Sequence, residues 1–330
     1  MRLTDFDYHL PKELIAQYPL KDRKACRLLV LDRNKGTVTH GMFKDFTRFF
    51  SPGDALVLND TKVLSCRLIG KRATGGKVEL LLLRERQEGV FEALIKPGRL
   101  KAGETILLNG GGLSCEIISR NQVRFIVDSV DQIYRAGVMP LPPYIKRIPE
   151  ELDAAYYQTV YAKNEGAIAA PTAGLHFTED LLEEVTACGI KKTFLTLHIN
   201  AATFKPVKAA DVITHQMERE YYHINKEAIR LIEGARKSHS RIIAVGTTSC
   251  RAMEAYAASG EEQGYTDLFI YPGYTFRYVD TLLTNFHLPC TTLFILVCAF
   301  AGSSLVRKAY KEAVARKYRF YSYGDAMLIL

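Results

Sequence analysis

The sequence predicts an α/β protein, in which a mixed, mainly parallel sheet is covered by helices and interrupted by a small inserted β-barrel. After residue 150, buried apolar strands such as 192–199 and 241–246 alternate with helical segments such as 226–238. That alternation is typical of a sheet covered by helices. Between residues 63 and 130, short β-rich runs recur between glycine-containing turns and show no helical period, a pattern typical of a small barrel.

The length of 330 residues allows two domains of about 100–200 residues each. We expect residues 1–60 and 150–330 to form the α/β domain, and residues 61–149 to form the inserted barrel. The second boundary follows the stiff, extended segment Pro140-Leu141-Pro142-Pro143, in which the proline rings restrict the backbone.

Several elements of the α/β domain can be placed in chain order. In the first part, we expect a short helix around 12–17, strands at 28–31 and 55–60, and a helix at 43–50. In the second part, residues 167–170 read as a strand that turns through Pro171 and Gly174. Thr178 then caps a helix whose first turn is acidic. Later segments add a strand at 267–271, a buried helix at 293–301 and a basic helix at 304–317.

The charge pattern indicates an anionic partner, with nucleic acid the first candidate. The formal net charge is +8, and it is concentrated in two zones. Residues 61–150 carry fifteen Lys or Arg against nine Asp or Glu, and residues 305–321 carry six against one. A solvated basic surface without a ligand is the alternative. The candidate contacts to nucleic acid are Arg67, Lys71, Arg72, Arg307, Lys308 and Lys311.

Composition also excludes several classes of protein. The seven cysteines are scattered without a paired C-x-x-C spacing, which argues against a zinc ribbon or a disulfide framework and favours the cytoplasm. The first residues are not an apolar leader, and the longest apolar run, 293–301, is too short for a membrane span. We expect no membrane contact.

Histidines follow three of the predicted strands and are candidate site residues. His176, His198 and His287 lie at these ends, with the hydroxyl groups of Thr172 and Thr284 nearby in sequence. Polar groups at the carboxyl ends of neighbouring strands can converge on one pocket. A satisfied, buried His176 in an ordinary turn remains the alternative. The spacing does not favour a metal site, and there is no G-x-S-x-G nucleophile motif.

The segment Gly246-Thr247-Thr248-Ser249 follows a buried strand and precedes a helix at 250–258. Free N–H groups at a helix start attract a carboxylate or a phosphate. Ordinary capping by threonine and serine is the alternative. No G-x-G-x-x-G motif follows the first strand, so a nicotinamide cofactor is not supported.

These motifs together resemble the S-adenosylmethionine:tRNA ribosyltransferase-isomerase family of queuosine biosynthesis, over nearly the whole chain. The matching segments are 5–11, 58–61, 157–162, 170–177, 245–248, 284–289 and 322–327. The resemblance implies an α/β domain interrupted by a barrel, in agreement with the pattern of strands and helices.

The resemblance also implies a reaction. The ribosyl part of S-adenosylmethionine would be transferred and isomerised onto 7-aminomethyl-7-deazaguanine at the wobble position of a tRNA. Adenine and methionine would leave, and the product would be epoxyqueuosine-tRNA. S-adenosylmethionine would be a co-substrate, with no metal or redox cofactor. The expected partners are therefore S-adenosylmethionine and the tRNA that carries the deazaguanine precursor in its anticodon.

This chemistry needs proton transfer next to a sulfonium and at the leaving adenine, and aromatic faces near the cationic sulfur. The proposed acid–base residues are His176, Asp280 and His287. The proposed residues around S-adenosylmethionine are Thr172, Gly174, His198, Gly246, Thr247, Thr248, Tyr271, Asn285, Phe286, Tyr323 and Asp325. Which residue acts as acid or base is left open.

The chain departs from the family pattern at three positions. Asn200 and Ala202 stand where the family usually has glycine, and Glu218 stands where it tends to have a second histidine. A glycine needed for close approach or for positive φ is hard to replace. Two alternatives therefore remain beside the ribosyltransferase-isomerase. One is a paralogue that binds tRNA or another RNA with altered or lost transferase activity, and the other is a small-molecule S-adenosylmethionine enzyme.

Overall fold

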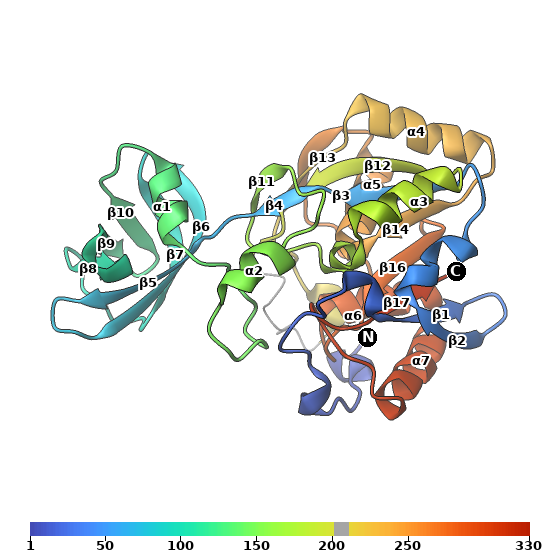
Figure 1. The fold of residues 1–330 in the computed structure, drawn as a ribbon, viewed down its shortest axis with the longest axis horizontal. Coiled ribbons are helices and arrows are strands. Elements are labelled where there is room, and N and C mark those ends of the chain that lie inside the picture. The colour runs from blue at the N-terminus through green and yellow to red at the C-terminus, as the bar shows by residue number, and fades with distance from the viewer. Residues whose placement is uncertain (201–210) are drawn as a thin grey trace.

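The computed structural model describes residues 1–200 and 211–330, and it shows an α/β domain beside a closed barrel (Figure 1). Over the described residues, the α/β domain contains a nine-stranded sheet with the order β15-β13-β12-β3-β14-β16-β17-β1-β2. Its strands are β1 (Arg27–Asp32), β2 (Thr37–Met42), β3 (Ala55–Asn59), β12 (Lys191–Leu197), β13 (Glu220–His223), β14 (Ile242–Val245), β15 (Gln263–Thr266), β16 (Thr281–Asn285) and β17 (Ala326–Ile329).

The centre of the sheet is parallel and its flanks are antiparallel. Strands β12, β3, β14 and β16 run parallel to one another. Strand β17 is antiparallel to β16 and parallel to β1, while β2 and β13 pair antiparallel with β1 and β12. The sheet is therefore mixed, and the carboxyl ends of the four central strands meet at one edge.

Both faces of the sheet are buried, because its strands are apolar on both sides. Ala55 and Val57 of β3 belong to one core, while Leu56 and Leu58 belong to the other. Continuous apolar strands of this kind need helices on each face. The first core contains residues of α4 (Lys226–Lys237), α5 (Gly246–Ser259), α6 (Thr292–Ala301) and α7 (Ser303–Ala315), and the second contains residues of α3 (Glu179–Ala187) and of a 3₁₀ helix (Phe43–Phe49).

Six strands close the barrel in the order β10-β7-β6-β5-β8-β9. Gly70 of β5 is needed there, because a Cβ at this position would lie 2.6 Å from the carbonyl oxygen of Leu107. The barrel strands are β5 (Arg67–Arg72), β6 (Lys77–Gln87), β7 (Val90–Lys96), β8 (Thr105–Leu108), β9 (Leu113–Ser119) and β10 (Gln122–Phe125), and the helix α1 (Val130–Ala136) follows them.

Two segments connect the barrel to the α/β domain. On the way in, β4 (Thr61–Val63) leads to β5, and on the way back the chain passes through α2 (Glu151–Tyr156) and β11 (Asn164–Ala167). Strands β4 and β11 pair in parallel, so the two connections lie side by side between the two parts (Figure 1). We retain 61–149 as the proposed extent of the inserted domain.

Three local predictions differ from the structure. Residues 267–271 are not a strand, because the chain pairs with β13 through β15 at 263–266 instead. The strand before Pro171 ends at Ala167. Helix α5 begins at Gly246, so Thr247, Thr248 and Ser249 lie inside its first turn, and Val245 occupies the N-cap. Helix α3 is capped by Thr178, as predicted.

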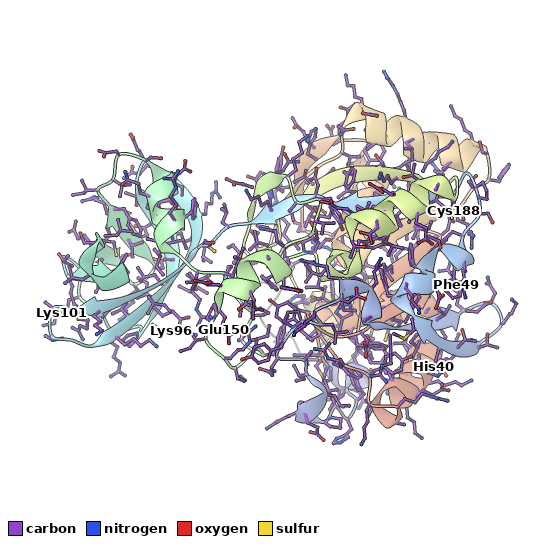
Figure 2. The ribbon with its side chains drawn as sticks, viewed as in Figure 1. His40, Phe49, Lys96, Lys101, Glu150 and Cys188 are labelled. Atoms are coloured by element: carbon purple, nitrogen blue, oxygen red, sulfur yellow. The ribbon has the colours of Figure 1, made fainter. Side chains whose placement is uncertain are left out.

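The two basic zones do not form one continuous surface. The barrel and α7 lie at opposite ends of the molecule (Figure 1). Figure 2 shows the same separation between Lys101 on the barrel and His40, whose ring contacts Glu312 of α7 at 3.3 Å. Any polyanion that contacts both zones must span the long axis of the protein.

In the described part of the chain, no single helix is long and apolar enough to cross a membrane.

Candidate functional site

A pocket lies at the edge of the sheet where the central parallel strands end. It holds about 740 Å³ of empty space, part of it open to solvent. Gly246 and Thr247 follow β14, while Thr284, Asn285 and His287 come from the end of β16 and the residues after it. The other lining residues are Tyr144, Tyr157, Ala169, Ala170, Pro171, Thr172, Ala173, Ile199, Met217, Thr248, Arg251, Thr292, Leu293, Tyr321 and Ser322.

The turn that carries Thr172 into this pocket is held tightly. Residues Thr172–His176 form a 3₁₀ helix directly after Pro171. A side chain at Gly174 would place its Cβ 2.1 Å from the hydroxyl oxygen of Tyr161 and 2.9 Å from Cγ2 of Thr159. Glycine is therefore required at residue 174 by close packing, and its role is to position the turn.

His287 lines the pocket, and its contacts leave one ring nitrogen free. Its Nε2 lies 2.7 Å from Oγ1 of Thr284, and its backbone N–H donates to the hydroxyl of Tyr310 at 3.1 Å. Its Nδ1 has no hydrogen-bond partner among the described residues. Burial lowers the pKa of His287 from 6.5 to about 3. The imidazole is therefore neutral near pH 7 and has one nitrogen available to a substrate.

His176 lies behind the pocket wall, and both of its ring nitrogens have partners. Nδ1 lies 3.2 Å from Sγ of Cys26, and Nε2 lies 3.1 Å from Nδ2 of Asn285. Burial lowers the pKa of His176 to about 3, and the charges of Arg23 and Arg319 add to that effect. Burial also raises the pKa of the Cys26 thiol. The pair is therefore neutral, unlike the ion pair of a nucleophilic cysteine and histidine.

Asn285 connects His176 to the pocket. Its Nδ2 donates to the carbonyl oxygen of Tyr321 at 3.1 Å and lies 3.1 Å from Nε2 of His176. The carbonyl contact fixes the orientation of the amide, since the reverse orientation would bring two oxygens together. Oδ1 of Asn285 is then a buried acceptor that has no partner in the described part of the chain. A buried acceptor of this kind costs about 1–3 kcal/mol unless a ligand satisfies it.

Arg251 places a second unsatisfied group at the pocket. The residue is 5% exposed. Its Nε donates to the carbonyl oxygen of Leu268 at 3.0 Å, and its Nη1 forms an ion pair with Glu220. Its Nη2 has no hydrogen-bond partner among the described residues. The guanidinium is thus held on two sides, and its third nitrogen is free.

The start of α5 adds further donors to the same wall. Val245 at the N-cap has no side-chain acceptor for the first N–H groups of the helix. Asn59 donates to Oγ1 of Thr248 at 3.2 Å, which anchors this turn to the end of β3. The free N–H groups and the helix dipole favour an anion at this position.

The pocket brings together six of the predicted site residues and leaves others elsewhere. Those that line it are Thr172, Gly246, Thr247, Thr248, Asn285 and His287. Phe286 is fully buried among Tyr310, Tyr318 and Phe320. Tyr271 packs against Phe269.

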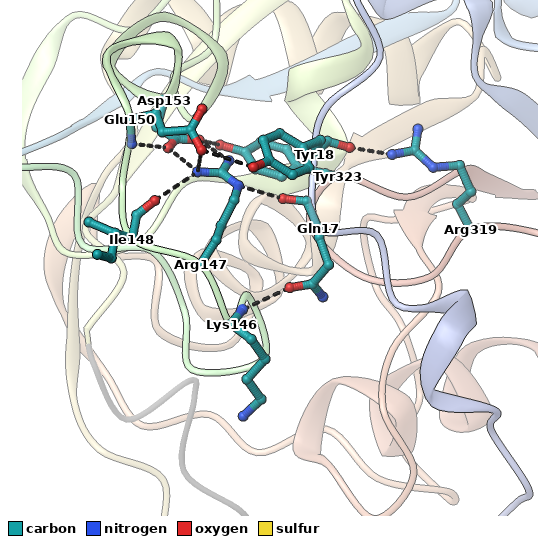
Figure 3. Close-up of polar contacts among 9 residues, drawn as sticks. All are labelled: Gln17, Tyr18, Lys146, Arg147, Ile148, Glu150, Asp153, Arg319 and Tyr323. Atoms are coloured by element: carbon teal, nitrogen blue, oxygen red, sulfur yellow. Dashed lines mark hydrogen bonds and ion pairs between the residues drawn. The ribbon is translucent and has the colours of Figure 1, made fainter.

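Three predicted polar residues are engaged in other contacts. His198 lies 2.8 Å from Oγ1 of Thr61 and stacks on Tyr221. Asp325 accepts from the backbone N–H groups of Arg27 and Arg319. The hydroxyl of Tyr323 donates to Asp153 at 2.7 Å (Figure 3).

Asp280 lies at the end of β16 opposite to the pocket. Its Oδ2 accepts from the N–H of Ile242, the first residue of β14, at 2.8 Å. The five residues of β16 separate it from the pocket edge, about 3.3 Å per residue. The structure therefore does not support Asp280 as an acid or base in this pocket.

Sequence reasoning missed Arg251 and the tyrosines of the pocket. Arg251 stands four residues after Thr247, one helical turn away on the same face. This spacing could have indicated that Arg251 lies at the same site as Thr247. Tyr144, Tyr157 and Tyr321 come from the two ends of the barrel connection and from the C-terminal segment. No local pattern marks them as neighbours.

The side chains proposed to contact nucleic acid differ in whether they already have partners within the protein. On β5, Arg67 pairs with Glu79 at 3.0 Å and Arg72 pairs with Glu104, while Lys71 is exposed. On α7, Arg307 donates to the carbonyl oxygen of Asp5. Lys308 approaches the carbonyl oxygen of Gly36 at 3.5 Å.

The departures from the family pattern lie near the pocket or outside the described residues. The backbone N–H of Asn200 donates to Glu220 at 3.0 Å, and its side chain donates to the carbonyl oxygen of Arg219 at 2.9 Å. Glu218 is exposed. Ala202 lies outside the described residues. Within the described ranges, no group of three or more His, Cys, Asp or Glu residues is arranged to hold a metal ion.

Comparison with known proteins gives one consistent result. The family model described as "Queuosine biosynthesis protein" matches residues 3–329. The S-adenosylmethionine:tRNA ribosyltransferase-isomerases of Caldanaerobacter subterraneus subsp. tengcongensis and Sulfurihydrogenibium sp. are 50% and 48% identical to this chain, over the full length of both proteins in each pair.

A solved structure agrees with these relatives. The crystal structure of the Thermotoga maritima S-adenosylmethionine tRNA ribosyltransferase matches 99% of this chain and 100% of its own, with 36% identity and a TM-score of 0.58. Similarity of this extent covers the α/β domain and the barrel together. The chain therefore belongs to the queuosine biosynthesis protein family.

Proposed function

We propose that this protein is an S-adenosylmethionine:tRNA ribosyltransferase-isomerase. The observation that carries the proposal is its identity of 48–50% to relatives of that name over their full length. It transfers and isomerises the ribosyl part of S-adenosylmethionine onto 7-aminomethyl-7-deazaguanine at the wobble position of a tRNA. Adenine and methionine are released, S-adenosylmethionine is the co-substrate, and the enzyme acts in the cytoplasm.

The pocket at the carboxyl edge of the sheet is the proposed reaction site. It offers both donors and acceptors that have no hydrogen-bond partner among the described residues. Tyr144, Tyr157 and Tyr321 supply aromatic surface in its wall. An aromatic face stabilises a nearby cation such as a sulfonium.

His287 is the proposed acid–base residue. It is neutral near pH 7, and its free Nδ1 belongs to a side chain in the pocket wall. A neutral imidazole can accept the proton that the sulfonium acidifies at the adjacent carbon, and can return a proton to departing adenine. Thr284 holds the ring through Nε2, which limits its rotation.

His176 is the proposed positioning residue for Asn285. Its ring lies behind the wall and contacts Asn285 through Nε2. The Asn285 Oδ1 that remains free can accept a hydrogen bond from an amine or hydroxyl of the substrates. His176→Asn should therefore weaken substrate binding by loosening Asn285, whereas a direct role in proton transfer would lower the single-turnover rate by about 10²–10⁴.

The test of function is release of adenine. The purified protein is incubated with S-adenosylmethionine and with tRNA that carries the deazaguanine precursor, and adenine is quantified by chromatography. Release that requires the modified tRNA supports the proposal. An otherwise identical tRNA with guanine at the wobble position is the matched control.

Each of the other outcomes would indicate a different function for this protein. Binding of tRNA without release of adenine would indicate a paralogue that has lost the transferase activity. Release without tRNA would indicate an enzyme that acts on a small molecule. Asn200 follows β12 near the pocket and stands where the family usually has glycine. If activity is low, Asn200→Gly is the first substitution to test.

A further inference from the structure

We propose that Arg251 and the first turn of α5 form a carboxylate subsite, which binds the methionine carboxylate of S-adenosylmethionine. This inference rests on the proposed function, and it names the groups that recognise one end of the co-substrate. It makes Arg251 a residue that determines specificity for an amino-acid-bearing sulfonium.

The guanidinium of Arg251 is already oriented before any ligand binds. Leu268 accepts from its Nε at 3.0 Å, and Glu220 forms an ion pair with its Nη1. Glu220 is itself held by the backbone N–H of Asn200 at 3.0 Å. A planar guanidinium fixed at two nitrogens loses little further freedom when the third binds an anion. Nη2 is the donor that has no hydrogen-bond partner within residues 1–200 and 211–330.

The helix supplies the second half of the subsite. Arg251 stands one turn after Thr247, and helical side chains point toward the N-terminus of their helix. Arg251, Gly246, Thr247 and Thr248 all line the same pocket. Since Val245 does not cap the helix, the N–H groups of the first turn are available to the same anion.

The position favours a small terminal carboxylate over a phosphate of tRNA. Arg251 is 5% exposed, and Thr247 and Thr248 are 6% and 9% exposed. A phosphodiester has a chain on both sides and cannot bring its oxygens to a wall this deeply buried. A carboxylate at the end of a short aliphatic chain can reach it and accept hydrogen bonds from Nη2 of Arg251 and from the N–H groups of the helix start.

The experiment compares S-adenosylmethionine with decarboxylated S-adenosylmethionine, which keeps the sulfonium, ribose, adenine and amine. For the wild-type enzyme we expect kcat/KM for adenine release to be on the order of 10²-fold higher with S-adenosylmethionine, since a buried charge pair is lost with the analogue. Arg251→Met should lower kcat/KM for S-adenosylmethionine by a similar factor and leave the analogue nearly unchanged. The ratio between the two compounds should then approach one.

Two further variants control for the loss of an arginine elsewhere and for misfolding. Arg33→Met removes an arginine that also contacts backbone carbonyl oxygens, those of Phe300 and Asp280, but lies at the opposite edge of the sheet. It should leave the ratio at its wild-type value. If Arg251→Met does not fold because Glu220 loses its partner, the double variant Arg251→Met/Glu220→Gln removes both charges.

Three outcomes would overturn the subsite. The first is equal kcat/KM of the wild-type enzyme for the two compounds, which needs no variant. The second is an unchanged ratio in folded Arg251→Met. The third is a higher KM for tRNA with a salt dependence reduced by about one unit, which would assign Arg251 to a phosphate.

Failure of the proposed function would look different. In that case the wild-type protein would release no adenine from S-adenosylmethionine with the modified tRNA. Equilibrium dialysis of the two sulfonium compounds without tRNA would still report on the subsite. Preferential binding of the carboxylate-bearing compound, lost in Arg251→Met, would support the subsite independently of turnover.

Discussion

The pocket and the cluster around Asp153 are both rich in buried polar groups, but they differ in how fully those groups are paired. In the cluster, Arg147 contacts both oxygens of Asp153 at 2.6 and 2.7 Å, and Tyr323 donates to the same carboxylate at 2.7 Å (Figure 3). In the pocket, Nη2 of Arg251 and Oδ1 of Asn285 have no partner among the described residues.

The cluster has a structural role that follows from its connections. Arg147 also donates to the carbonyl oxygen of Gln17 at 2.9 Å and lies over the ring of Tyr18. Arg147 lies on the segment that returns from the barrel. It therefore links this segment to the N-terminal residues Gln17 and Tyr18 and, through Asp153 and Tyr323, to the C-terminal part of the chain. Burial alone does not indicate function. A buried group with spare hydrogen-bonding capacity at a cavity does so more strongly.

The largest expected effect is on His287. His287→Gln removes the proposed acid–base group but keeps an amide that can contact Thr284. Loss of general acid–base catalysis typically lowers a rate by about 10²–10⁴. We expect a fall of that size in the single-turnover rate of adenine release, with binding of both substrates retained. A rate near that of the wild-type enzyme would remove His287 from the mechanism.

The contrast between His287 and His176 shows how far the sequence could predict the site. The carboxyl edge of the parallel strands was predictable, and with it the neighbourhood of Asn285, Gly246 and His287. Which histidine has a free nitrogen was not predictable, because the partner of His176 is Cys26, 150 residues away. For the same reason, the pairing of Tyr323 with Asp153 escaped prediction, since only the fold brings these two residues together.

The fold itself was largely predictable, because apolar periodicity directly reflects burial on one or two faces. Its main errors arose where local signals were ambiguous. The segment 267–271 has an apolar composition typical of a strand, yet the edge position beside β13 is filled by 263–266. The distribution of charge along the sequence likewise does not reveal where the charges lie in the folded protein. It could therefore not show that the two basic zones lie at opposite ends of the molecule.

The second prediction tests the structural role of the cluster by measuring the stability of a variant. Asp153→Asn leaves the charge of Arg147 without its bidentate partner, and breaking a buried pair in this way typically costs about 3–5 kcal/mol. We expect a large fall in the free energy of unfolding, measured by urea denaturation. At a temperature where the variant is folded, kcat and both KM values should stay near those of the wild-type enzyme. A selective rise in KM for S-adenosylmethionine would instead place the cluster in the site.

A smaller effect is expected at Tyr323. Tyr323→Phe removes one hydrogen bond to a carboxylate that keeps its bonds to Arg147, which should cost about 1.5–3 kcal/mol of stability. The Kd for S-adenosylmethionine should not change, because the ring stays in place and does not line the pocket at the sheet edge. Isothermal titration with S-adenosylmethionine and a urea melt on the same sample separate the two effects.

The next comparison uses pH. The folded pKa of His176 is about 3 against an ordinary value of 6.5, so its contribution is fully present above pH 6.5. As pH falls from 6.5 toward 3, the unfolded chain takes up a proton that the folded protein does not, and stability is lost at up to about 1.4 kcal/mol per pH unit. His176→Gln lacks this loss. Its deficit in unfolding free energy relative to wild type should therefore shrink between pH 6.5 and pH 5, whereas a constant deficit would mean that His176 titrates normally in the folded protein.

The smallest effect concerns the two basic zones, which can be tested separately because they lie at opposite ends. Arg67→Ala/Lys71→Ala/Arg72→Ala should reduce the slope of log Kd for tRNA against log salt by about one, at about one for each lost phosphate contact, since Arg67 and Arg72 are already paired with Glu79 and Glu104. Arg307→Ala/Lys308→Ala/Lys311→Ala should reduce it by about one to three, since Arg307 and Lys308 contact only neutral backbone carbonyl oxygens and keep their charge available. Reductions in both variants would mean that tRNA spans the long axis of the protein. If neither slope changes, the phosphate contacts lie outside both zones, and the basic charge of the barrel and of α7 serves only solvation.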